Sequence, residues 1–157
     1  MHQILRSNRL SPWRYFGRTG IVLLSMLLAA PFAAAEQYQR LGAWDVHYVV
    51  IRSSFLKPEI AANNGIIRGP DRAVLNLSIL DQGGRPSVAK VTGRFRNLLG
   101  LDTELEFDEV REGEAVYYLA QFRHTDREIL RFSIDLTPPD GTNQRLEFQQ
   151  QLFEDGR

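Results

Sequence analysis

The fold class is decided by residues 115–136, which read Ala-Val-Tyr-Tyr-Leu-Ala-Gln-Phe-Arg-His-Thr-Asp-Arg-Glu-Ile-Leu-Arg-Phe-Ser-Ile-Asp-Leu. Apolar side chains recur at every second position in both halves of this segment. Side chains two residues apart lie on the same face of a β-strand, so the alternation predicts one strand over 115–124 and another ending near Leu136. The polar run Thr125–Glu128 turns the chain between them.

The same alternation appears on both sides of this segment. It predicts strands over about 43–52, 73–80, 88–96, 104–108 and 146–152, with turn residues between them, and Gly93 suggests a bulge. No window of helical length has helical periodicity. The pattern therefore predicts an all-β domain, an immunoglobulin-like antiparallel sandwich of two sheets and about seven strands. A small β-barrel is the alternative, because patterning alone does not separate the two.

The first 35 residues have the composition of a cleavable signal peptide. A basic stretch without acidic residues, Met1–Arg18, precedes the apolar run Ile21–Ala30 and the small residues Ala33–Ala35. An apolar helix of about 10 residues reaches only half-way across a bilayer of about 30 Å, although an uncleaved anchor is the competing interpretation. We expect cleavage before Glu36, a single periplasmic domain over 36–157 and no permanent membrane span.

Charge and cysteine content exclude several classes of protein. The chain has no cysteine, so disulfides, a thiolate nucleophile and a cysteine zinc site are absent. Four of the 19 basic residues lie in the leader, which leaves 15 basic against 19 acidic residues, a net charge of −4. This balance argues against nucleic-acid binding and against an electrostatic anchor on anionic lipid.

Residues suited to catalysis or metal binding are sparse. His47 lies beside Asp45 and His124 beside Asp126, but two histidines at unrelated positions make a weak metal site. The acidic series at 104, 106 and 108 is expected on one solvated strand face, although it could suit a cation or a glycosidase. No serine lies in a nucleophile-elbow motif. We therefore expect no catalytic residue, no metal and no cofactor, and we expect that the protein is not an enzyme.

Two groups of residues are candidates for binding. The 20-residue connection 53–72 is long for a compact domain and rich in apolar side chains, which either fold back over an open end of the sandwich or form a contact patch. Arginine side chains suit carboxylate ligands, although surface pairing with neighbouring acids is the ordinary role. The candidate residues are Phe55, Leu56, Ile66, Ile67, Arg68, Arg94, Arg96 and Asn97.

Several short motifs of the mature chain resemble a family of uncharacterised bacterial exported proteins grouped as a domain of unknown function. The motifs include Phe55-Leu-Lys-Pro-Glu-Ile-Ala61, Gly65-Ile-Ile-Arg68, Leu75-Asn-Leu-Ser-Ile-Leu80, Tyr117-Tyr118 and Phe148-Gln-Gln150, and they cover essentially the whole mature chain. The resemblance implies export and a β-sandwich. It brings no catalytic residue with it.

Together these observations favour a non-enzymatic binding or protein-interaction module of the cell envelope. Its partner would be an envelope protein or a small ligand. The alternatives are an envelope hydrolase that uses carboxylate and histidine side chains, and a metal-binding carrier. Both methionines lie in the leader, which argues against a copper(I) carrier.

Overall fold

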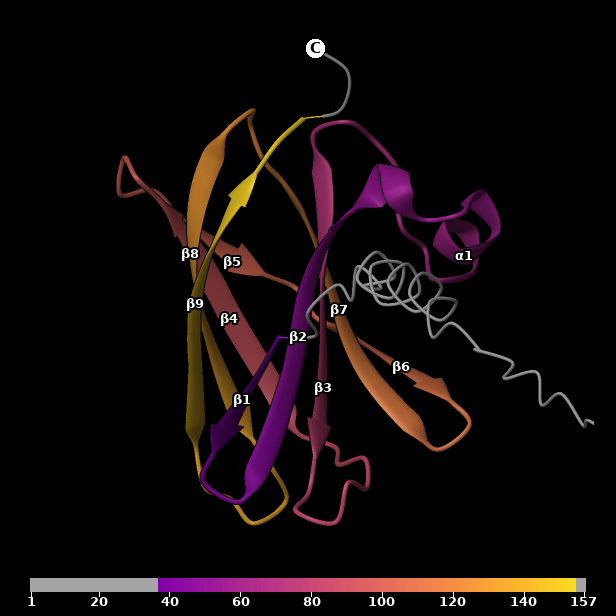
Figure 1. Ribbon diagram of the computed structural model, residues 1–157, viewed down its shortest axis with the longest axis vertical. Coiled ribbons are helices and arrows are strands. Elements are labelled where there is room, and N and C mark those ends of the chain that lie inside the picture. The colour runs from indigo at the N-terminus through magenta and orange to yellow at the C-terminus, as the bar shows by residue number, and fades with distance from the viewer. Residues whose placement is uncertain (1–36, 155–157) are drawn as a thin grey trace, which may run out of the picture. The chain divides into compact units, whose positions relative to one another are not determined.

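The computed structural model describes residues 37–154, which form two antiparallel sheets packed face to face (Figure 1). The predicted signal peptide lies outside the described residues. One sheet has five strands, in the order β1 (Gln37–Leu41), β2 (Trp44–Arg52), β3 (Arg72–Leu80), β7 (Ala115–Arg123) and β6 (Asp108–Glu112). The other has four, in the order β5 (Asp102–Leu105), β4 (Lys90–Asn97), β8 (Glu128–Thr137) and β9 (Gln144–Leu152).

The strand order is that of an immunoglobulin-like sandwich. Strands β2, β3, β7 and β6 correspond to A, B, E and D, and β4, β8 and β9 correspond to C, F and G. Strand β5 extends the second sheet beside β4, and β1 is an addition that pairs with the first half of β2. The predicted all-β, two-sheet sandwich is confirmed, and the two sheets do not close into a barrel.

The inner faces of the two sheets enclose one apolar core. Four phenylalanine rings lie at its centre, with Phe132 5.8 Å from Phe95, 5.5 Å from Phe122 and 4.6 Å from Phe148 between centroids. Leucine and isoleucine side chains of β3, β8 and β9 complete the core and are almost fully buried. The alternation that predicted the strands also identified these inward-facing positions, because every second side chain of a strand points to the same face of the sheet.

The structure has two strands more than the sequence predicted. The segment 104–108, expected as one strand, is divided between β5 in one sheet and β6 in the other. Leu105 and Phe107 both face the core across this crossing, so the alternation continues without a break. Strand β1 was missed because its side chains are mostly exposed and carry no apolar alternation. The turn at Asp81–Gly84 likewise joins the two sheets.

Gly93 occupies a regular position in β4, and the suggested bulge is wrong. Its pairing with Ile134 continues the register of the neighbouring pairs without an extra residue. A Cβ atom at position 93 would lie 2.5 Å from Ile134 Cδ1 and 3.0 Å from the carbonyl oxygen of Ser133. Glycine is required here because the β8 backbone and the Ile134 side chain occupy the space of a side chain.

We predict that Gly93→Ala lowers the free energy of unfolding by about 1–3 kcal/mol, because the methyl group must displace β8 backbone atoms. Urea denaturation of the two proteins measures the difference. The exposed neighbour Thr92 serves as a control, and Thr92→Ala should cost less than about 1 kcal/mol. Equal losses for the two variants would contradict the close approach of β8.

Candidate functional site

Exposed apolar side chains lie in two groups at the end of the sandwich where β2, β4, β7 and β9 finish, one on the β4–β5 hairpin and one formed by the connection 53–72 and Phe153. Of the ten large apolar residues that are exposed in the described part of the chain, six lie at this end. The other four lie on β1, β2, α1 (Pro58–Asn63) and the link before β4. We call the six the apolar end; their exposed fractions are Phe55 65%, Ile67 59%, Leu98 62%, Leu99 94%, Leu101 65% and Phe153 48%.

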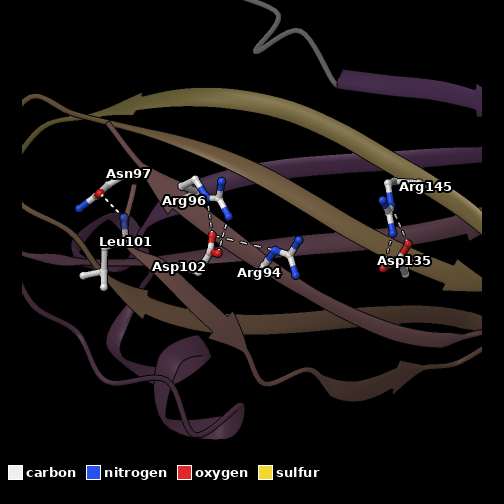
Figure 2. Close-up of polar contacts among 7 residues, drawn as sticks. All are labelled: Arg94, Arg96, Asn97, Leu101, Asp102, Asp135 and Arg145. Carbon is white, nitrogen blue, oxygen red and sulfur yellow. Dashed lines mark hydrogen bonds and ion pairs between the residues drawn. The ribbon is translucent and has the colours of Figure 1, made fainter. Parts of the chain in front are cut away.

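Three of these residues lie on the tip of the β4–β5 hairpin, residues 97–101. The Asn97 side-chain oxygen accepts hydrogen bonds from the backbone N–H groups of Leu99 and Leu101, each at 3.0 Å. Figure 2 shows the bond from Leu101. The Gly100 N–H donates to the Asn97 carbonyl at 3.0 Å, and Gly100 has a φ of +84°, which a residue with a side chain rarely adopts. These bonds hold the leucine side chains in solvent on a fixed turn.

The long connection 53–72 covers the outer face of the five-stranded sheet. Leu56 and Ile66 pack with Ala61 of α1 against Val74 and Leu119. Val74 and Leu119 belong to the outward face of β3 and β7, so this small cluster is separate from the core between the sheets. Leu56 and Ile66 therefore pack against the sheet, and the connection covers a sheet face instead of an open end of the sandwich.

Hydrogen bonds fix the connection to the sheet. The Gln121 side chain donates to the Gly65 carbonyl at 3.0 Å and accepts from the Ile67 N–H at 2.9 Å. The buried Ser53 hydroxyl accepts from the Gly69 N–H at 3.0 Å, and Arg68 donates to the Ser54 carbonyl at 2.8 Å. Arg68 thus braces the connection, while the neighbouring Ile67 side chain stays exposed.

Phe55, at the end of the short helix η1 (Ser53–Phe55), also faces solvent. The Arg52 guanidinium carbon lies 3.9 Å from the centre of its ring. Phe55 and Phe153 line one groove beside the ends of β2 and β9. Sequence reasoning missed Phe153, which directly follows the strand expected over 146–152.

Arg94 and Arg96 lie on the outer face of the four-stranded sheet, beside the hairpin. Arg96 binds Asp102 through two hydrogen bonds of 2.7 and 2.6 Å, and Arg94 lies 4.0 Å from the same carboxylate (Figure 2). The hydrogen bonds from Arg96 hold the pKa of Asp102 below its usual range, and partial desolvation opposes this effect. Arg131 stands directly opposite Arg96 in the register and lines the same shallow groove.

The structure places the eight predicted binding residues in four settings. Phe55 and Ile67 are exposed, whereas Leu56, Ile66 and Arg68 hold the connection in place. Arg94 and Arg96 form ion pairs with Asp102, and Asn97 shapes the hairpin. Sequence reasoning missed Leu98, Leu99 and Leu101. Three leucines in a five-residue connection are more apolar side chains than a solvated turn requires, and this excess could have identified them.

The two histidines lie in different surroundings. The His47 ring stacks on Tyr38 at 5.5 Å, and Asp45 beside it is engaged by Arg40 at 2.7 and 2.8 Å. His124 is buried, with Nδ1 3.1 Å from the Thr125 carbonyl oxygen. Over residues 37–154 no group of three or more histidine, cysteine or acidic side chains could hold a metal ion.

The expected acidic face is divided between the two sheets. Glu104 lies on β5 and Asp108 on β6, with Glu106 in the crossing between them. All three side chains are exposed, but they do not share one strand face.

In the described part of the chain there is also no helix long and apolar enough to cross a membrane.

We predict that Arg96→Met raises the pKa of Asp102 toward its usual value of 3.8, because the bidentate hydrogen bond is lost. The lowered pKa means that this ion pair contributes stability above the carboxyl pKa of the unfolded chain, and that the contribution disappears as the pH falls. Carbon-13 NMR of the carboxyl group follows the titration. Arg145→Met, which removes the separate pair with Asp135, should leave Asp102 unchanged; an Asp102 curve that ignores Arg96→Met would contradict the pairing.

The family model of a domain of unknown function, DUF4426, matches residues 38–155. A crystal structure of a DUF4426 family protein from Pseudomonas aeruginosa is 40% identical, covers 77% of this chain and 97% of its own, and has a TM-score of 0.70.

Two structures of FetP from uropathogenic Escherichia coli are also similar: a copper-bound variant, and the protein as isolated after expression in the E. coli periplasm. Their identities are 12% and 10% and their TM-scores 0.54 and 0.53, over 78% and 76% of this chain and 93% and 95% of theirs, so this likeness concerns the fold alone. A search of curated proteins found no match. From the family model and the Pseudomonas structure, the chain belongs to the DUF4426 family.

Proposed function

We propose that the protein is a non-enzymatic binding module of the bacterial cell envelope and that the apolar end is its contact surface. One observation carries this proposal: six of the ten exposed large apolar residues in the described part of the chain share one end of the sandwich. Single apolar residues scattered over a surface are ordinary, whereas a gathered set is typical of a site of interaction.

The way these residues are held supports the same conclusion. The backbone N–H of Ile67 is held by the Gln121 side chain, and the backbone N–H of Leu99 is held by the Asn97 side chain. A surface that is ordered before its partner arrives loses little conformational entropy on binding. An apolar end built on such hydrogen bonds is therefore better suited to recognition than a flexible loop of the same composition.

Export rests on the leader. Its basic start, short apolar run and small residues before Glu36 are those of a secretory signal peptide. Strand β1 begins at Gln37, one residue after the predicted cleavage site. The proposed cut would therefore leave the described sandwich whole, with its first strand at the new N-terminus.

A non-enzymatic role is supported by the placement of the polar side chains. His47 lies on β2 and stacks on Tyr38, whereas His124 is buried at the end of β7, so the two imidazoles lie in different surroundings. The copper-bound state of FetP raises the metal-carrier alternative. Copper(I) favours thioether and thiolate ligands, and after cleavage this chain would contain neither methionine nor cysteine.

Site-specific photocrosslinking in intact cells tests the proposed surface. A photoreactive amino acid replaces Phe55 or Phe153 at the apolar end, and Ala43 or Thr142 at the opposite end serves as the control. We expect discrete adducts from the first pair only, because a contact surface holds its partner within reach of the probe. Adducts of equal yield from both ends, or from neither, would contradict the proposal.

A further inference from the structure

We propose that the leucine hairpin, residues 97–101, inserts shallowly into a phospholipid surface. The inference rests on the proposed function for the location of the contact surface, and it adds that at this point the partner is lipid. Leu98, Leu99 and Leu101 would enter the boundary between headgroups and acyl chains. Three features of the hairpin support a lipid partner: its shape, its backbone hydrogen bonds and the arginines behind it.

The hairpin tip is convex and purely aliphatic. Leu99 is 94% exposed, and no charged or aromatic side chain lies between Leu98 and Leu101. A protein partner needs a pocket shaped to receive such a tip, whereas a fluid layer of acyl chains adapts to it. Leucine side chains gain most from this transfer, because all of their surface is apolar.

Four of the five backbone N–H groups of residues 97–101 already have partners inside the hairpin. The N–H groups of Asn97, Leu99, Gly100 and Leu101 all donate within the hairpin, at distances of 3.0 or 3.1 Å. In hydrocarbon a donor without a partner is costly, so exposed loops are normally excluded from the membrane. The Asn97 side chain accepts two of these bonds and removes much of that cost.

Guanidinium groups lie immediately behind the tip on the four-stranded sheet. From the hairpin inward, the register places Arg96 opposite Arg131 and then Arg94 opposite Ser133. Like charges directly opposite on neighbouring strands repel, and Asp102 is bound to Arg96. Among the described residues the Arg131 side chain makes no ion pair or hydrogen bond, although Glu147 lines the same groove. A phosphate oxygen would supply a hydrogen-bond acceptor for this side chain, since guanidinium and phosphate groups pair well.

The charge of the whole domain indicates which force dominates. The mature chain has a net charge of −4, so long-range attraction to an anionic surface is weak. Binding would depend on insertion of the leucines, and the arginines would set the depth by contact with phosphate. Salt that screens surface charges should therefore leave most of the binding in place.

Partitioning to vesicles of phosphatidylethanolamine and phosphatidylglycerol tests this inference. The protein is purified from the periplasm and sedimented with the vesicles. We expect measurable partitioning that Leu99→Ser lowers about tenfold, because one leucine side chain no longer enters the apolar layer. The exposed Val88, in the link before β4, provides the matched control; Val88→Ser should partition like the unaltered protein.

A second variant follows the tip directly. Leu99→Trp places a fluorophore on the hairpin, and we expect its emission to shift to shorter wavelength on addition of vesicles, with no such shift for Val88→Trp. Absence of partitioning, or partitioning that Leu99→Ser leaves unchanged, would overturn the inference. The inference would also be overturned if Leu99 acted only in self-association of the protein, which light scattering without lipid measures. If crosslinks from Phe55 and Phe153 persist in that case, the proposed function stands and only the lipid partner is lost.

Discussion

The structure depends on packing two sheets together without any disulfide between them. Phe132 is at the centre of this packing, stacked on Phe148 at an interplanar angle of 7° and inclined to Phe95 and Phe122. These rings come from β4, β7, β8 and β9, so one cluster joins strands of both sheets. In a chain without cysteine, such contacts and the surrounding aliphatic core supply the stability that disulfides give other small exported domains.

The apolar end is built on this core. Phe95 lies two residues before the start of the leucine hairpin, and Phe122 directly follows Gln121, whose side chain holds Ile67. The buried ring and the exposed side chain are thus tied to the same strand. A displacement of either strand would move both, and the exposed apolar residues keep their positions because the core keeps the strands in place.

Much of the fold could be predicted because the alternation of apolar residues is a local property. Strands β2, β3, β7 and β8 agree closely with the expected segments. The division at Glu106 could not be foreseen, since the alternation continues while the chain changes sheets and only non-local pairing shows it. Strand β1 was invisible for the opposite reason, because its pairing with β2 is made by the backbone of a polar segment.

The candidate site was predicted in part. Phe55 and Ile67 were identified from the apolar content of a long connection. The sequence did not distinguish these exposed residues from Leu56 and Ile66, which pack against the sheet. That distinction depends on Gln121, 54 residues after Ile67 in the chain. The hairpin leucines were not predicted, because apolar residues in a short connection do not show by themselves whether they face solvent or the core. The structure shows that the Asn97 side chain shapes the turn that exposes them.

The central claim is that the apolar end is an ordered surface before any partner binds. Native-state hydrogen exchange measured by NMR tests it most directly, because the N–H groups of Ile67, Leu99 and Leu101 are held by side-chain acceptors at the surface. The account predicts that these amides exchange more slowly than the free-chain rate, and that Gln121→Ala releases Ile67 alone and Asn97→Ala releases Leu99 and Leu101 alone. Exchange of all three at the rate of an unstructured peptide would contradict it.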